Sequence, residues 1–176
     1  MNRRKFIATG AAAALTLYGR ALVASPTAEE KAQKLGAKNY STFGNCCQST
    51  LATVQEVAGG VPDIVVQAGD GFAGGGGTTF GTCGALAGGL LALGCKAGRP
   101  GNELDDKTSY KKFRALPKGL SEKFKAKYGG CTCREVKEKF LGKSLDDATE
   151  DDKKRMKTDL CPGVVGQASA WVVAEL

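Results

Sequence analysis

The 176-residue sequence contains no histidine. This absence excludes a CxxCH haem site, imidazole-ligated zinc or copper, a Ser-His-Asp triad and a Cys-His dyad. Any metal centre must therefore use thiolate, carboxylate or backbone ligands, and no haem is expected. The sequence also lacks an apolar run of the ~20 residues that a membrane-spanning helix needs. We therefore expect no membrane span in the mature chain.

Cysteine and glycine are the residues in which the sequence is rich, with seven and 25 respectively. The length fits about one domain, and a hydrophobic content of 42% is that of a globular protein. Chemistry in this chain is thus expected to centre on thiols. The sequence shows no acid–base pair and no substrate pocket, so whether the protein is an enzyme stays open.

The first 24 residues have the pattern of an export signal. Arg3, Arg4 and Lys5 precede an apolar, alanine-rich run over residues 6–18. The paired arginines, followed by x-Phe-Ile, favour the twin-arginine route over the general secretory route. We predict a signal peptide over 1–24, a helical cysteine-rich redox domain over 25–176, and a periplasmic location. Because the twin-arginine route exports folded proteins, it also favours a thiolate site assembled before export.

The basic charge of the chain lies partly in this signal. Four of the 25 basic residues fall within 1–24, which leaves 21 against 18 acidic residues. The remaining lysines alternate with acidic residues and lack the one-sided basic stripe of a nucleic-acid binder. We therefore expect no nucleic-acid partner.

Hydrophobic spacing and capping residues predict an all-α fold, a small single-domain bundle of five to seven short helices with glycine-rich loops. Gly36 is expected to end the first helix, and Pro117 to break a charged one. The segment 62–72 is ambiguous between strand and helix. The expected helices span 27–36, 45–58, 79–95, 105–128, 133–140, 148–159 and 161–176.

Several cysteines fall at or near the expected helix starts, where free N–H groups and the helix dipole stabilise thiolates. Pro162 at a first helical position would make the preceding Cys161 an N-cap. These cysteines are Cys46, Cys47, Cys83, Cys131, Cys133 and Cys161.

The sequence resembles a family of redox-active proteins named for its C…GCAxxG…C…C cysteine pattern. The resemblance covers about residues 43–175. It departs from the family pattern at Gly84, which stands between the cysteine and the alanine. The matching residues are Asn45-Cys46-x-Gln48, Cys83-Gly84-Ala85-Leu86-Ala87-Gly88 after a glycine-rich stretch, Cys133-Arg134-Glu135, and Cys161.

The resemblance implies a small helical domain in which Cys46, Cys83, Cys133 and Cys161 converge on an iron–sulfur cluster, either [4Fe–4S] or [2Fe–2S]. A similar domain occurs in split-Soret cytochromes, but their haem function does not carry over to a chain without histidine. We predict electron transfer or redox sensing with an unidentified redox partner protein. A homodimer whose two subunits share a cluster stays open.

The three other cysteines leave the interpretation open. Cys47 and Cys131 are additional ligands or a disulfide with each other, whereas Cys95 is expected to be a buried core residue. Two other functions remain as alternatives: a thiol–disulfide redox or structural disulfide protein, and a module that binds a soft metal such as zinc or copper through thiolates.

Two further motifs are set aside. Gly69-x-Gly71-x-x-Gly74 matches a dinucleotide-binding fingerprint, but more glycines follow it instead of a helix. The acidic residues between 146 and 152 are explained as the start of a solvated helix rather than as a cation site.

Overall fold

Helices form almost all of the regular structure of the chain. The computed structural model describes residues 25–176, so the predicted export signal lies outside the described residues. The helices are α1 (Ala28–Phe43), α2 (Cys46–Ala58), α3 (Asp63–Ala68), α4 (Gly84–Ala97), α5 (Lys107–Phe113), α6 (Ala115–Tyr128), α7 (Cys133–Leu141), α8 (Glu150–Arg155) and α9 (Cys161–Ala174).

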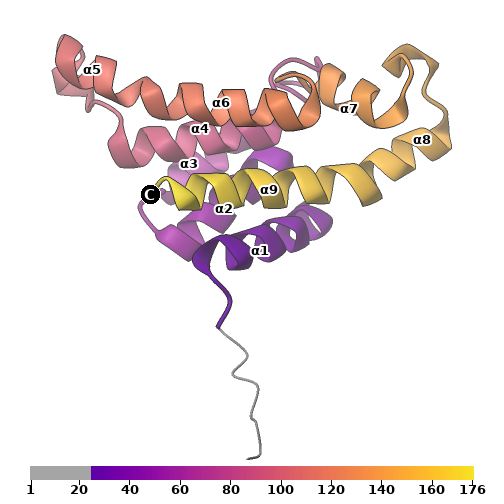
Figure 1. Cartoon of the computed structure of the whole chain (residues 1–176), viewed down its shortest axis with the longest axis horizontal. Helices are drawn as coiled ribbons and strands as arrows, with labels where there is room; N and C mark the ends of the chain where they lie inside the picture. Colours follow the sequence, from indigo (N-terminus) through magenta and orange to yellow (C-terminus); the bar gives the residue numbers. More distant parts are fainter. Residues whose placement is uncertain (1–24) are drawn as a thin grey trace, which may run out of the picture.

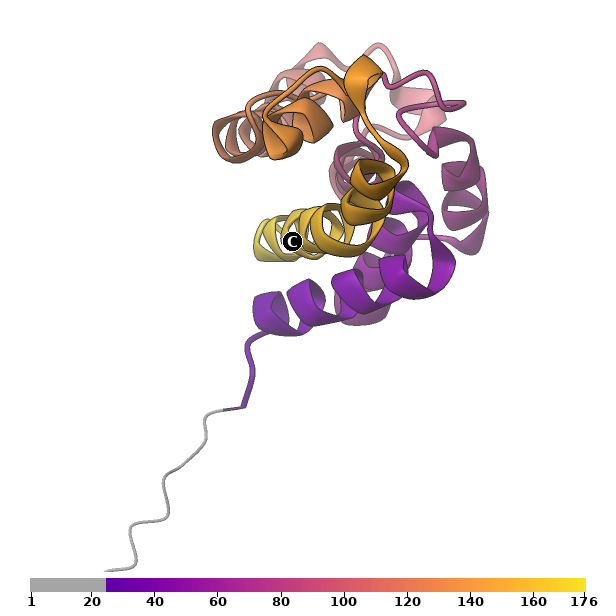
Figure 2. The same cartoon turned by 90° about the vertical axis from the view of Figure 1, so that its right-hand side faces the viewer.

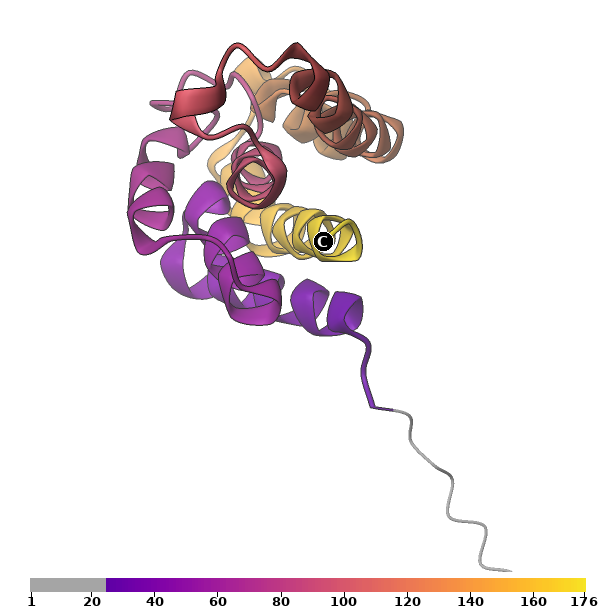
Figure 3. The same ribbon diagram turned by 90° about the vertical axis from the view of Figure 1, so that its left-hand side faces the viewer.

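The bundle is arranged around α4 and α9. In Figure 1, α1 runs alongside α9, and α2 lies behind them. α6 and α7 lie on the side of α9 that faces away from α1. Figure 3 shows α4 nearly end-on among the other helices, and Figure 2 shows the same helices from the other end. α4 packs against α2, α6 and α9. The central position of α4 follows from its composition, because its run of Gly, Ala and Leu is buried on most sides.

This architecture confirms the predicted all-α single domain. Seven of the helices have seven or more residues, and no strand occurs in residues 25–176, only one isolated bridge between Thr82 and Thr132. The ambiguous segment 62–72 is helical, as α3 followed by a 3-10 turn over Gly69–Phe72. Within the described part, no helix is both long and apolar enough to cross a membrane.

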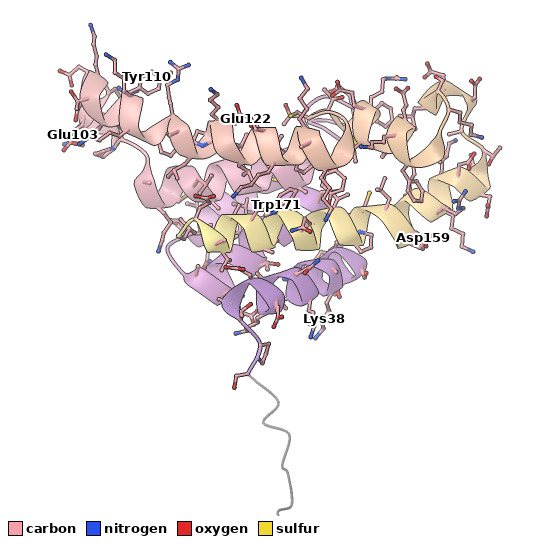
Figure 4. All side chains as sticks on the ribbon, in the orientation of Figure 1. Lys38, Glu103, Tyr110, Glu122, Asp159 and Trp171 are labelled. Carbon is pink, nitrogen blue, oxygen red and sulfur yellow. The ribbon has the colours of Figure 1, made fainter. Side chains whose placement is uncertain are left out.

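An aromatic cluster joins α6 to α9. The rings of Phe124 and Tyr128 lie 4.8 Å apart, and Trp171 meets them edge-on at 6.5 and 6.3 Å. Figure 4 shows Trp171 on α9. Such tilted arrangements add to the stability gained by burying the rings. This cluster fixes α9 against the helix that leads to Cys131 and Cys133.

Two predicted helix boundaries are wrong for steric reasons. Gly36 does not end α1, which continues to Phe43. A Cβ at Gly36 would lie 2.9 Å from Ser169 Oγ and 3.0 Å from Gly166 Cα, so glycine here permits close contact with α9. Pro117 does not break its helix either, because it lies in the first turn of α6, where no N–H is needed. The chain bends instead at Arg114.

The prediction that Cys161 caps a new helix is also wrong. α8 continues through a π-helical turn over Met156–Leu160 directly into α9, and the Cys161 N–H donates to the Met156 carbonyl. Figure 4 marks Asp159 in this turn. Pro162 lacks the N–H that an uninterrupted α-helix would use, and a wider turn accommodates it.

Candidate functional site

Four cysteines from four different helices meet at one end of the bundle. Cys46 is the first residue of α2, Cys83 precedes α4, Cys133 begins α7 and Cys161 begins α9. The Cys46 thiol interacts electrostatically with the other three, and Cys161 also interacts with Cys83 and Cys133. These are the four residues that the family resemblance singled out, and the fold brings them together.

Asn45 positions Cys46 by capping α2. Its side-chain oxygen accepts hydrogen bonds from the N–H groups of Cys47 at 3.0 Å and Gln48 at 3.2 Å. Its amide nitrogen donates to the Asp70 carboxylate at 2.9 Å. A buried cap that is bonded on both sides holds the first turn of α2, and with it Cys46, in one orientation.

Two glycines in the first half of α4 let this helix approach that same turn. A Cβ at Gly84 would lie 3.0 Å from Cys46 Cβ, and a Cβ at Gly88 would lie 2.6 Å from the Cys47 carbonyl oxygen. The two positions are four residues apart and so share one face of α4. Close contact between these helices brings Cys83, at the start of α4, next to Cys46.

A short antiparallel pairing sets Cys83 and Cys133 side by side. Thr82 pairs with Thr132, the Cys83 N–H donates to the Cys131 carbonyl at 2.9 Å, and the Cys133 N–H donates to the Gly81 carbonyl at 2.6 Å. Thr132 also caps α7 together with Glu135. The start of α7 is thus tied to the start of α4.

A cavity of about 420 Å³ opens onto three of the four thiols. Its lining includes Tyr40, Cys46, Phe80, Cys133, Lys137 and Cys161. The cavity can therefore hold a group larger than a single ion.

Phe80 forms part of the wall of this cavity in an unusual backbone conformation. Its φ is 61°, and it follows four glycines, 74–77, that all have positive φ. Lys137 Nζ lies 4.9 Å and Arg134 Cζ 5.7 Å from the centre of its ring. A bulky residue with positive φ is rare and is found mainly where structure around a site enforces it.

The thiols of Cys46 and Cys161 have opposite pKa shifts. Hydrogen bonding to Cys46 lowers the pKa of Cys161 to about 7, although burial acts in the other direction. The Tyr40 hydroxyl and the charge of Lys137 also contribute to this lowered pKa. The same contact with Cys161, together with burial, raises the pKa of Cys46 well above its usual value. Cys161 is therefore the thiol of the four that ionises first.

Burial is the main cause of the pKa shifts of the other two thiols, Cys83 and Cys133. It raises the pKa of Cys83 to about 12, although the N–H groups of Ala85 and Leu86 hydrogen-bond to its sulfur and lower it. Burial likewise raises the pKa of Cys133, while nearby Lys137 lowers it. Helix starts alone thus do not ionise these thiols. A bound cation would be needed to hold all four as thiolates.

The other three cysteines lie outside this group. Cys47 is fully buried on α2, where a Cβ at Gly69 would lie 3.2 Å from its sulfur. Cys131 is half-buried, and its thiol lies 3.6 Å from the Ser121 carbonyl. Cys95 is exposed on α4, so the expectation of a buried core residue is wrong. Its position faces away from the helices that pack on α4.

Sequence reasoning missed two side chains that contact the thiols. Lys137 is four residues after Cys133, and helical spacing would have placed both on one face of α7. Tyr40 had no such signal, because the first helix was expected to end before it. Burial and the nearby thiols raise the pKa of Tyr40, so its hydroxyl stays protonated and can donate to Cys161.

Within residues 25–176, no three His, Cys, Asp or Glu side chains are close enough together to hold a single metal ion. The ligands of a cluster stand farther apart than those of one ion, because iron and sulfide atoms lie between them. What the site offers is four neighbouring thiols, three of which line a cavity.

The fold and the site together define a small helical protein with a buried multi-thiol centre. Residues 43–175 match the family model described as "Putative redox-active protein (C_GCAxxG_C_C)", and the chain belongs to this family. Membership supports a redox role. No significant similarity links the chain to a curated protein or to a solved structure.

Proposed function

We propose that the chain is an exported electron-transfer or redox-sensing protein that holds an iron–sulfur cluster. Cys46, Cys83, Cys133 and Cys161 would be its ligands, in a [4Fe–4S] or a [2Fe–2S] centre. The observation that carries the proposal is the meeting of these four thiols, from four helices, beside a cavity of about 420 Å³. When bound, the cluster would supply reversible one-electron chemistry.

The surrounding residues would support such a centre. The N–H groups of Ala85 and Leu86 donate to the Cys83 sulfur, and the Tyr40 hydroxyl is directed to Cys161. Hydrogen bonds to ligand sulfurs raise the reduction potential of iron–sulfur centres. Lys137 adds a positive charge that partly offsets four thiolates. The chain thus favours the reduced, more negative state of the centre.

Export and location are part of the same proposal. A twin-arginine signal over 1–24 would carry the folded, loaded protein to the periplasm, where a redox partner protein would exchange electrons with it. Of the three lysines that line the cavity, Lys153 pairs with Glu150 at 2.6 Å, whereas Lys137 and Lys157 form no ion pair within residues 25–176. The rim therefore favours a partner with an acidic surface.

The decisive test is anaerobic purification of the full chain, followed by iron, sulfide and zinc analysis beside the visible spectrum. We expect iron with matching sulfide and a brown visible absorption. Cys83→Ser and Cys161→Ser should remove the colour, whereas the matched control Cys95→Ser should keep it. Zinc without iron would instead support a soft-metal module, and loss of colour in every single cysteine variant would indicate misfolding rather than loss of a ligand.

A second candidate, thiol–disulfide exchange, is favoured by one observation. The Cys46 and Cys161 thiols are neighbours, and their interaction lowers the pKa of Cys161 to about 7. A reactive thiolate beside a second thiol is the arrangement that disulfide exchange requires. Purified protein without iron, in which these two cysteines form a disulfide, would support this function over the cluster.

A further inference from the structure

Cys83 and Cys131 lie opposite each other on two paired segments of backbone. The bridge joins Thr82 to Thr132, and the Cys83 N–H donates to the Cys131 carbonyl at 2.9 Å. Directly opposed residues of an antiparallel pair have Cα atoms about 4.5–5.5 Å apart, within the ~4.4–6.8 Å that a disulfide spans. We propose that Cys83 and Cys131 form a disulfide when the chain is oxidised, and so constitute a modification site beside the four-thiol centre.

The local backbone allows the two sulfur atoms to meet. Opposed Cβ atoms in a regular ladder are about 4.5–5.5 Å apart, slightly more than the ~3.5–4.5 Å of a disulfide. Gly129 and Gly130 directly precede Cys131, and Gly129 has a φ of 83°, a conformation that glycine adopts without strain. Because the Cys131 N–H donates to the Glu135 carboxylate at 3.0 Å, closure of the disulfide depends mainly on rotation of the two side chains. The contact of the Cys131 thiol with the Ser121 carbonyl is a weak hydrogen bond that little opposes a change of rotamer.

An oxidant can reach the Cys131 thiol more easily than the Cys83 thiol, so Cys131 reacts first. Cys131 is half-buried, whereas Cys83 is 5% exposed. With a small-molecule disulfide as oxidant, the Cys131 thiolate attacks one of its sulfur atoms and releases one small thiolate. The Cys83 thiolate then attacks the Cys131 sulfur and releases the second. Two electrons pass from the cysteines to the oxidant, and the two thiol protons leave with the released thiols.

A consequence for the centre follows, and this part rests on the function proposed above. A sulfur atom in a disulfide cannot bind iron as a thiolate, so Cys83 cannot serve both sites at once. Oxidation of the pair would remove one of four ligands. A disulfide oxidant is then expected to release iron in a manner that depends on Cys131, although Cys131 is not itself a ligand.

The first experiment maps the disulfide in metal-free full-length chain, independently of any cluster. The protein is incubated with oxidised glutathione, alkylated, and digested with trypsin and chymotrypsin without reductant. The digest releases peptides 81–86 and 129–134. We expect these two peptides to be linked, and fragmentation between Cys131 and Cys133 to place the bond at Cys131. Glutathione held on Cys131 with Cys83 unlinked, or either residue joined to a different cysteine, would overturn the proposal.

Two variants test whether Cys131 is the residue that forms the disulfide. Cys131→Ser should abolish the linked peptide while leaving the circular dichroism spectrum unchanged, because serine can keep the contact with the Ser121 carbonyl. Cys95→Ser, which removes an exposed thiol elsewhere, should leave the linkage intact.

The second experiment tests the consequence on iron-loaded protein. Oxidised glutathione should bleach the wild type several-fold faster than Cys131→Ser. Equal rates of bleaching in the two proteins would show that the disulfide and the cluster do not compete for Cys83. If no preparation contains iron, the proposed cluster is refuted but the proposed disulfide is not. The linked peptides then decide whether the disulfide forms.

Discussion

Replacing Gly88 with alanine tests how the helices hold the site. The new Cβ would lie 2.6 Å from the Cys47 carbonyl oxygen and 3.0 Å from Thr50 Cβ. Because the nearest obstacle is backbone at the core of the bundle, α2 and α4 must separate to admit the methyl group. Overpacking of this kind costs about 1–3 kcal/mol, and the better helix propensity of alanine returns about 1 kcal/mol. We expect Gly88→Ala to destabilise the fold by up to about 2 kcal/mol.

The same helix supplies a matched control. Gly94 also lies in α4, but a Cβ there would meet nothing within 4 Å. Gly94→Ala should therefore show only the gain in helix propensity, about 1 kcal/mol of added stability.

Urea unfolding of the two variants and the wild type, followed by circular dichroism, measures these opposite shifts. If Gly88→Ala is as stable as Gly94→Ala, the close contact between α2 and α4 is not what the motif glycine provides. Iron content per chain gives a second comparison, because separation of the two helices would move Cys46 away from Cys83. We expect less iron in Gly88→Ala than in Gly94→Ala.

Three further predictions concern single side chains. Asn45→Ala removes a buried cap and its bond to Asp70, and should cost about 2 kcal/mol in urea unfolding; a loss below about 0.5 kcal/mol would contradict the capping role. Ser49→Ala should stabilise the fold by about 1 kcal/mol in the same assay, since the buried Ser49 hydroxyl has no hydrogen-bond partner among the described residues. A hydrogen bond from Lys143 lowers the pKa of Asp152 to about 2. The ionised Asp152 carboxylate therefore stabilises the fold above pH ~4, and this stabilisation is lost as the pH falls towards 2. The melting temperatures of wild type and Asp152→Asn should therefore differ above pH ~5 and converge on acidification; a constant difference would count against that pair.

The parts of the fold that the sequence predicted well are those set by local chemistry. The bounds of α2 follow from a side-chain cap at Asn45 and a glycine with positive φ, Gly59. They agree with the predicted helix over 45–58. The errors came from tertiary contacts. Gly36 has the residue type of a helix end, yet it serves close packing against α9, and nothing in residues 27–36 indicates a helix 130 residues later in the chain.

The candidate site divides in the same way. Its four cysteines came from a family resemblance, not from spacing, because the chain brings them together only when folded. The π-helical turn before Cys161 replaced the expected N-cap, since a proline pattern at a helix start looks the same in both cases. Tyr40 was missed because its helix was expected to end early, so one wrong boundary removed one residue from the site.

The spacing of the four cysteines also bears on how the centre would be assembled. Consecutive members are separated by 28 or more residues, and each comes from a different helix. No two of them can stay near each other in an unfolded chain, so binding of a cluster would be coupled to folding of the whole bundle. A secretory route that threads the chain unfolded would have to build the centre after export, in a compartment that oxidises thiols. The predicted twin-arginine signal avoids this difficulty, and the two predictions therefore depend on each other. If replacing Arg3 and Arg4 by lysine leaves export of iron-loaded protein unchanged, the centre is assembled by another path.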